Sequence, residues 1–214
     1  MFRLVCLFLG YIIGSIQIAY LTGKLFANID IRQHGSGNAG TTNVLRTLGR
    51  KAGLIVFVGD VLKSVFAYIL LSNIFGGHGT FTSTSNMNIL PGIYAGLGTV
   101  LGHSFPFYLN FKGGKGVACI LGIILCIDLS LALTLYAIGV SVLIYKSYIS
   151  AASLTMCAVF PIFLYLYNFS IEAILISILI SLLCFYLHRG NIYRIINGTE
   201  RKFSFKKKEE GDDQ

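Results

Sequence analysis

The sequence predicts an all-α integral membrane protein with seven transmembrane helices, an external N-terminus and a cytoplasmic C-terminus. Of its 214 residues, 55% are hydrophobic and 12% are charged, with a mean hydropathy of +0.74, whereas soluble chains carry about 25% charged residues. The apolar residues form long runs, and about 20 such residues cross a bilayer as a helix. The cations gather between the runs and in the tail, as cytoplasmic segments do.

The first apolar run covers about Leu4–Leu21. Lys24 follows this run rather than preceding it, so we expect an uncleaved span and not a signal peptide. Small residues within the run, such as Ser15, favour close helix packing over catalysis. The polar stretch Lys24–Lys51 carries five cations and is therefore expected on the cytoplasmic face.

The second span covers about Gly53–Phe75 and contains two charges, Asp60 and Lys63. Residues three apart share one helix face and can pair. Charges inside a span usually face protein or water, so the pair either shapes a site or forms a structural ion pair, and both alternatives stay open. The connection Gly76–Asn88 has no lysine or arginine and is expected outside.

The third span covers about Ile89–Tyr108 and leads back to the cytoplasmic face. The apolar residues from Val117 to Tyr145 are too many for one span, and Asp128 divides them. We therefore expect two crossings with a turn near Asp128. The first piece, Val117–Ile127, is only about 16 Å long as a helix, so one span plus a re-entrant segment is the alternative.

Spans six and seven cover Ser150–Tyr167 and Ile171–Leu187, and the chain ends inside with His188–Lys202. Residues 1–202 are expected to form one membrane-embedded domain. Residues 203–214 form a charged tail that we expect to be disordered near anionic headgroups. With this topology, three polar, cation-rich stretches all fall on the cytoplasmic face, where we expect the active site.

The first of these stretches, His34–Gly49, has the parts of an anion-binding loop. Glycines let several backbone N–H groups converge, short polar side chains add donors, and Arg46 adds a fork that fits phosphate or carboxylate. The glycines and polar residues are Gly35, Ser36, Gly37, Asn38, Gly40, Thr41, Thr42 and Asn43. The alternative is a flexible polar loop between two spans.

The second and third stretches also suit an anion. Lys112-Gly-Gly-Lys-Gly116 offers backbone amides and the Lys115 charge, although it lacks the Walker A spacing, and a tight turn with cytoplasmic lysines is the alternative. The third stretch begins His188-Arg-Gly-Asn191. His188 can act as an acid or base, donate to a phosphate, or simply hydrogen bond at the interface.

Several classes of protein are disfavoured by composition and spacing. The net charge of +8 lies in loops and tail without a basic domain, which argues against nucleic acid as a partner. The five cysteines all lie in apolar runs and have no metal spacing. Only Asp30, Asp60 and Glu200 supply carboxylates near the inner face before the tail, which disfavours two-carboxylate hydrolases and metal-dependent kinases. No H-x-x-x-x-D acyltransferase motif is present.

Two function classes remain from the residues alone: an enzyme that acts on a lipid or acyl phosphate, and a transporter of a phosphorylated anionic metabolite. Seven spans without an inverted repeat weaken the transporter, and the polar clusters all lie on one side.

Three stretches, Gly35–Gly49, His103–Ala118 and His188–Arg194, stand in a fixed order, with Gly198–Lys202 after the third. They closely resemble the three motifs of the bacterial acyl-phosphate:glycerol-3-phosphate acyltransferases, the PlsY family, and the likeness runs from Gly14 to Lys202. The chain departs from the family's usual residues at three positions: Gln17, Cys119 and Ser147.

The resemblance implies transfer of a fatty acyl group from acyl phosphate to the sn-1 hydroxyl of glycerol 3-phosphate, giving lysophosphatidic acid and phosphate. It implies a multi-pass protein of the bacterial plasma (inner) membrane that uses neither acyl-CoA nor a metal or other cofactor. Membrane lipid is the expected surroundings, and functional coupling to the enzyme that makes acyl phosphate is a further expectation.

The resemblance also assigns residues. Those for acyl phosphate lie in the first two stretches: Gly35, Ser36, Gly37, Gly113, Gly114, Lys115 and Gly116. Those for glycerol 3-phosphate are Arg46, Ser150, His188 and Asn191. Those that support the first loop are Asn38, Thr42 and Asn43. Ser36, Lys115 and His188 are the expected catalytic residues, with Lys115 polarising the carbonyl, and Glu200 is expected to be structural.

Overall fold

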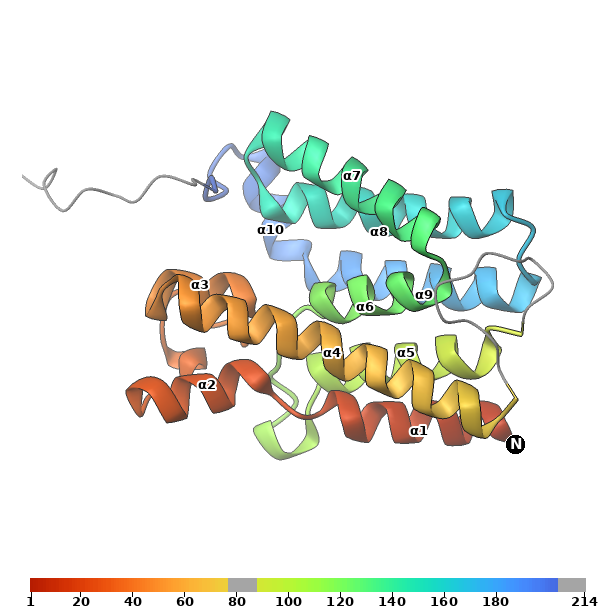
Figure 1. The fold of residues 1–214 in the computed structure, drawn as a ribbon. Coiled ribbons are helices and arrows are strands. Elements are labelled where there is room, and N and C mark those ends of the chain that lie inside the picture. Colours follow the sequence, from red (N-terminus) through yellow and green to blue (C-terminus); the bar gives the residue numbers. More distant parts are fainter. Residues whose placement is uncertain (77–87, 204–214) are drawn as a thin grey trace, which may run out of the picture.

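The computed structural model describes residues 1–76 and 88–203, and within these ranges every regular element is a helix. The expected outer connection and the charged tail lie almost wholly outside the described residues. Seven of the helices form the bundle in Figure 1: α1 (Phe2–Gly14), α4 (Arg50–Ile74), α5 (Leu90–Ser104), α6 (Val117–Ile127), α7 (Leu129–Lys146), α8 (Ile149–Leu166) and α9 (Ile171–Leu187). Shorter elements join them at one end: α2 (Ile18–Ala27), η1 (Ile31–Gln33), α3 (Thr41–Leu48), η2 (Phe107–Leu109) and α10 (Arg189–Ile196).

Successive bundle helices run in alternating directions, which brings the polar stretches to one end of the molecule. In Figure 1, α2, α3 and α10 lie at this end, and the N-terminus of α1 lies at the other. We call residues 28–49, 105–116, 147–148 and 188–203 the polar end. The alternation follows from the sequence, because a polar break separates each apolar run from the next, from the single residue Asp128 to the long stretch Lys24–Lys51.

Four helical segments of the described chain are long and apolar enough to cross a membrane: Phe2–Ala27, Arg50–Ile74, Leu129–Lys146 and Ile149–Leu166. A fifth is added if α9 and α10, which meet at a bend of 60°, form one broken span. Helices α5, with 15 residues, and α6, with 11, are shorter, about 22 and 16 Å long. The predicted count of seven crossings therefore exceeds what helix length alone supports.

The first apolar run is broken, where the sequence predicts one continuous span. Helix α1 ends at Gly14 and α2 begins at Ile18. The backbone freed by the break is bound by distant side chains: Tyr108 Oη donates to Ser15 O (2.7 Å) and Lys63 Nζ donates to Ile16 O (2.7 Å). The break is therefore a built feature of the fold.

Two other boundaries differ from expectation, and one is confirmed. The polar stretch after α2 is partly helical, since it holds η1 and α3. Helix α5 ends at Ser104 instead of reaching Tyr108, because Pro106 disfavours helical backbone in the residue before it. The predicted division at Asp128 is confirmed: its carboxylate caps α7 by accepting from Leu131 N (2.7 Å).

Helices α1 and α5 pack with their backbones in near contact. A Cβ added at Gly14 would lie 2.2 Å from Thr99 O, and one added at Gly98 would lie 2.1 Å from Leu7 O. Small residues four apart permit such approach in membranes. The main buried cluster lies beside this pair, between α5, α6, α8 and α9, and the five cysteines are buried and unpaired.

Candidate functional site

The first polar stretch is shaped by one buried amide side chain. Asn43 Nδ2 donates to Ile31 O (3.0 Å) and His34 O (2.9 Å), and its Oδ1 accepts from Ser36 N (2.8 Å). The loop needs left-handed backbone at Gly35 (φ +62°), where a Cβ would also lie 2.2 Å from Asn43 Oδ1. Asn43 thus holds the loop that presents the exposed Ser36.

The second stretch packs directly against the first. Gly114 N donates to His103 O (3.1 Å). A Cβ at Gly114 would lie 2.1 Å from His103 Nε2 and 2.6 Å from Ala39 O, so only glycine fits between α5 and the first loop. Gly116 adopts a left-handed φ of +76° just before α6. These glycines deliver Lys115 to the polar end.

Lys115 joins the third stretch through a hydrogen-bond network centred on Glu200. The Lys115 ammonium donates to Asn191 Oδ1, and Asn191 Nδ2 donates to Glu200 Oε1 (2.6 Å). Ser150 Oγ donates to the same carboxylate oxygen (2.8 Å), and Arg194 Nε binds Glu200 Oε2 (2.7 Å). One carboxylate therefore orients residues from α8 and α10 around the lysine.

Charge at this network is tuned by burial. Burial lowers the pKa of Lys115 to about 8, helped by the charge of Arg194, while Glu200 opposes the shift. Burial alone would raise the pKa of Glu200, but hydrogen bonds from Asn191, Ser150 and Arg194 outweigh it and lower that pKa. The carboxylate is thus held ionised next to a lysine that loses its proton unusually easily.

Two further predicted residues lie at the same end. Partial burial and the charges of Arg201 and Arg194 lower the pKa of Arg46, and Glu200 opposes the shift, so Arg46 lies within the field of the third stretch. His188 is buried, and its Nδ1 lies 2.8 Å from Cys184 O. Because a carbonyl only accepts, Nδ1 carries a proton and donates to Cys184 O.

A cleft of about 290 Å³ opens where the three stretches meet. Its lining combines glycines and cations with aromatic and aliphatic side chains: Gly37, Asn38, Ser104, Phe105, Phe111, Lys112, Gly113, Gly114, Lys115, Tyr186, Leu187 and Arg189. Backbone amides and cations suit a phosphate, and the apolar rings suit an acyl chain. The arrangement can therefore hold an amphiphilic anion.

The predicted residues fall into two groups around this cleft. Five of them line it: Gly37, Asn38, Gly113, Gly114 and Lys115. The others stand outside its lining: Gly35, Ser36, Thr42, Asn43, Arg46, Gly116, Ser150, His188 and Asn191. Ser150 and Asn191 belong to the network of Glu200, and Thr42 lies half-buried in the first turn of α3.

Sequence reasoning missed parts of the site that depend on contacts between distant segments. The sequence analysis expects Glu200 to be structural, and its ion pair with Arg194 is in line with that. Its hydrogen bonds with Ser150 and Asn191 were not expected. The aromatic lining by Phe105, Phe111 and Tyr186 was also missed. Their position beside the polar stretches was the available signal.

Comparison with known proteins gives consistent results along nearly the whole chain. The model of a family described as glycerol-3-phosphate acyltransferase matches residues 4–198. A glycerol-3-phosphate acyltransferase of Alkaliphilus metalliredigens is 38% identical over 206 residues, covering 96% of this chain and 98% of that protein. Glycerol-3-phosphate acyltransferase 2 of Bacillus anthracis is 40% identical over 201 residues, covering 94% and 98%.

Solved structures agree with this comparison. The crystal structure of PlsY (YgiH), an integral membrane glycerol 3-phosphate acyltransferase, in its glycerol 3-phosphate form matches with a TM-score of 0.83 and 35% identity, covering 94% of this chain and 96% of that one. Its lysophosphatidic acid form matches with a TM-score of 0.81 and 34% identity, covering 94% and 95%.

Proposed function

This chain belongs to the glycerol-3-phosphate acyltransferase family, and from that premise we propose that it acylates the sn-1 hydroxyl of glycerol 3-phosphate with acyl phosphate as the donor. The observation that carries the proposal is that all three polar stretches contribute to one cleft with cationic and apolar walls. The solved relatives described with glycerol 3-phosphate and with lysophosphatidic acid support the acceptor and the product.

In this proposal the second stretch binds the donor. The loop Gly113–Gly116 and the Lys115 ammonium hold the phosphate of acyl phosphate, together with Ser36 and its flanking glycines. The Gly113 and Gly114 amides keep the loop folded by donating to Ser104 O and His103 O, so the amides of Lys115 and Gly116 are the ones that face the phosphate. Lys115 also stabilises the charge that develops on the carbonyl oxygen. The apolar lining at Phe105 and Phe111 accommodates the start of the acyl chain.

The acceptor binds between α3 and the third stretch. Arg46 pairs with the phosphate of glycerol 3-phosphate, and Ser150 and Asn191, oriented by Glu200, hydrogen bond to its polar groups. His188 uses its Nε2 to hold the reacting hydroxyl. Asn38, Thr42 and Asn43 keep the first loop in place.

The reaction is an acyl transfer from an activated donor. The sn-1 oxygen attacks the acyl carbonyl carbon, a new ester C–O bond forms, and the C–O bond to phosphate breaks. The hydroxyl proton passes to the donor's own phosphate, which leaves as inorganic phosphate. Since acyl phosphate is a mixed anhydride, positioning of the two reactants supplies much of the acceleration.

The proposed function also implies a location and an orientation for the protein. We propose a multi-pass protein of the bacterial plasma membrane with seven crossings, the N-terminus outside and the polar end in the cytoplasm. Support comes from the alternating helix directions in Figure 1 and from the cations gathered at the polar end. Helix α6 is short enough that its end would lie within the membrane.

The decisive experiment supplies alternative acyl donors to the purified protein in lipid. Labelled glycerol 3-phosphate should become lysophosphatidic acid when acyl phosphate is present and stay unchanged with acyl-CoA alone. A Lys115→Ala variant purified in parallel is the control for a contaminating acyltransferase. Equal use of acyl-CoA would refute the donor assignment, and uptake into sealed vesicles without acylation would favour the transporter instead.

A further inference from the structure

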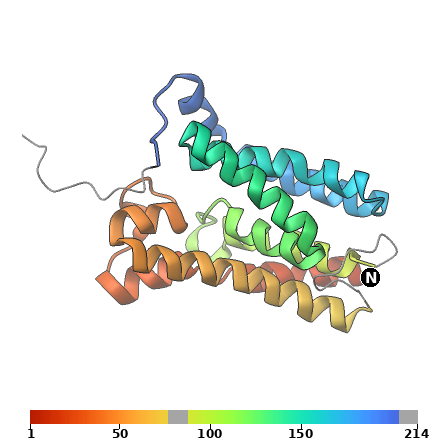
Figure 2. The same cartoon turned by 45° about the horizontal axis from the view of Figure 1, so that its top comes forward.

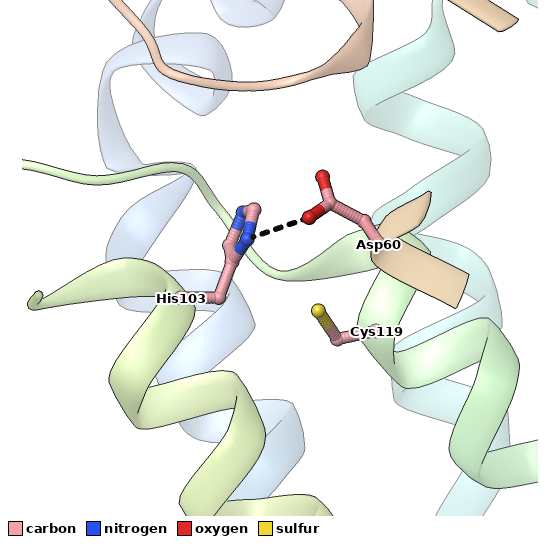
Figure 3. A group of neighbouring side chains, drawn as sticks. All are labelled: Asp60, His103 and Cys119. Carbon is pink, nitrogen blue, oxygen red and sulfur yellow. Dashed lines mark ion pairs between the residues drawn. The ribbon is translucent and has the colours of Figure 1, made fainter. Parts of the chain in front are cut away.

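A buried cluster of ionisable side chains lies between α4, α5 and α6, and the proposed mechanism leaves it without a task. Asp60, His103 and Cys119 offer atoms within 4.8 Å of one another, and each is at most 3% exposed. Figure 3 shows the His103 ring directed at the Asp60 carboxylate, with Nδ1 3.4 Å from Oδ1. Burying ionisable side chains costs free energy, and such groups inside membrane helices are usually functional.

Lys63 occupies the position that a metal ion would take in this cluster. Its Nζ lies 2.8 Å from Asp60 Oδ1 and 3.0 Å from His103 Nδ1. A divalent ion bound to the same two atoms would stand about 2 Å from each, in contact with an ammonium group of like charge. The cluster is therefore an ion pair with an attached imidazole.

His103 is the member that touches the donor-binding loop. Its carbonyl accepts from Gly114 N (3.1 Å), and a Cβ at Gly113 would lie only 2.0 Å from that oxygen. Its ring Nε2 lies so close to Gly114 that a Cβ there would be 2.1 Å away. The imidazole of His103 therefore packs directly against the loop that precedes Lys115.

Two hydrogen bonds also connect the cluster to the break between α1 and α2. Lys63 Nζ donates to Ile16 O (2.7 Å), and Gln17 Nε2 donates to His103 O (2.8 Å). The Lys63 ammonium and the Asp60 carboxylate both lie against Nδ1 of the ring, and Gln17 from the break binds the backbone carbonyl of His103. The orientation of His103 is therefore fixed by two segments distant in sequence.

We infer that Asp60, Lys63 and His103 form a positioning cluster that sets the placement of Gly113–Lys115 for the donor phosphate. This inference rests on the proposed function. Lys63 and Asp60 together fix the ring of His103, and Lys63 also neutralises Asp60. The ring then sets how closely the glycine loop approaches Ala39 and the first stretch. None of the three lines the cleft, so in this inference each acts through the loop.

The test uses two variants that keep the buried charge balanced. His103→Gln removes the ring and leaves the pair of Asp60 and Lys63 intact. Asp60→Asn combined with Lys63→Met removes both charges and leaves the ring without its partner. Each variant should lower kcat at least tenfold and raise KM for acyl phosphate at least fivefold, while KM for glycerol 3-phosphate stays within twofold.

A second readout follows the loop itself without substrate. In hydrogen–deuterium exchange, the peptide covering residues 104–116 should exchange at least tenfold faster in both variants. The backbone carbonyl of residue 103 is still present, but the ring contact that keeps the Gly114 amide against it is lost or loosened. Glu172→Gln is the matched control, since it weakens the ion pair of Arg3 and Glu172 at the opposite end. This control should leave both kinetics and loop exchange within twofold of wild type, even where its melting temperature falls.

The outcomes separate this inference from the proposed function. If the wild-type protein shows no acyl transfer, the proposed function is refuted. If loop exchange is unchanged in the folded variants, the positioning role of the cluster is refuted. The inference is also overturned if the wild type is active and the folded His103→Gln variant keeps its kcat and its KM for acyl phosphate within twofold. Cys119→Ala should behave as wild type, and a tenfold loss in this variant, or in wild type after chelation, would show a metal site and overturn the ion-pair assignment.

Discussion

At the scale of single residues, Asn43 supports a loop through three hydrogen bonds that no neighbouring side chain duplicates in the described structure. Asn43→Ala leaves Ser36 N and two carbonyls without their partner. We expect a loss of about 2 kcal/mol or more in the free energy of unfolding and at least a tenfold loss of acyl transfer. Thermal unfolding and activity would be measured beside Gln33→Ala, an exposed change just before the loop that should be silent. Equal behaviour of the two variants would contradict the role of Asn43.

The proposed binding roles make a direct prediction for three residues. Ser36→Ala, Arg46→Ala and Lys115→Ala should each lower acyl transfer at least tenfold, about 1.4 kcal/mol or more in the barrier. Steady-state kinetics with both substrates would show whether the loss falls on the donor or the acceptor. Near-normal activity in a folded Lys115→Ala variant would remove Lys115 from the mechanism.

The lowered pKa of Lys115 predicts a pH profile. The proposed mechanism needs the charged lysine, and burial brings its pKa to about 8. The charged fraction therefore falls as pH rises through 8, and kcat/KM for acyl phosphate should fall about tenfold per pH unit above it. In Lys115→Arg this alkaline decline should disappear, because arginine stays charged. An unchanged decline in that variant would assign it to another group.

The site residues that sequence could predict are those whose chemistry is local. Glycines, amides and cations lie close together in each polar stretch, so an anion site can be proposed from the sequence without a fold. The network of Glu200 could not, because Ser150 lies 50 residues away along the chain and its hydroxyl gives no local signal. The same limit hid His103, whose partners Asp60 and Gly114 come from different elements.

At the scale of elements, helix boundaries were predictable where the responsible residue lies within the boundary. Asp128 caps α7, and the division predicted there is confirmed. Pro106 ends α5 at Ser104 by the same kind of local effect, which the predicted span to Tyr108 overlooked. The break after Gly14 was not predictable, because Tyr108 and Lys63 satisfy its carbonyls from other helices. The sequence therefore predicted one span where the structure has two helices, α1 and α2.

The contact between α1 and α5 gives a prediction about stability. At Gly98 a Cβ would meet two backbone atoms, Leu7 O at 2.1 Å and Tyr11 N at 2.8 Å, so the helices must separate. Gly98→Ala should destabilise by about 1–3 kcal/mol, although alanine itself favours helix by about 1 kcal/mol. A thiol-reactive dye can follow melting, since all five cysteines are buried.

The matched control for Gly98 lies in α7. At Gly139 the nearest atom to an added Cβ is Ala152 O at 3.9 Å, an ordinary contact. Gly139→Ala should therefore leave the melting temperature unchanged or raise it slightly. If both alanines behave alike, close packing of α1 on α5 does not limit stability.

At the scale of the whole molecule, the fold brings polar stretches that are distant in the sequence together at one end. The polar stretches lie about 70 to 80 residues apart in the sequence, yet antiparallel helices return each of them to the same end (Figure 2). A lipid-borne donor and a water-soluble acceptor would meet there, because this end combines apolar helix surfaces with a cationic cleft. The composition predicted the membrane, and only the count of crossings depends on the short helix α6.

The crossing of α6 can be tested by the sidedness of Lys112 and Lys146, which flank α6 and α7 and are both exposed. With the five native cysteines replaced, Lys112→Cys and Lys146→Cys should both resist an impermeant maleimide in intact cells and react after permeabilisation, because two crossings return the chain to the cytoplasm. Ile74→Cys, exposed at the end of α4 that lies opposite the polar end, is the control that should react from outside in either case, because it precedes α6. If α6 is re-entrant, α7 alone crosses, and Lys146→Cys should react without permeabilisation while Lys112→Cys does not. That result would reduce the crossings to six and place the end of α7 outside, where Ser150 could not share a site with Lys115.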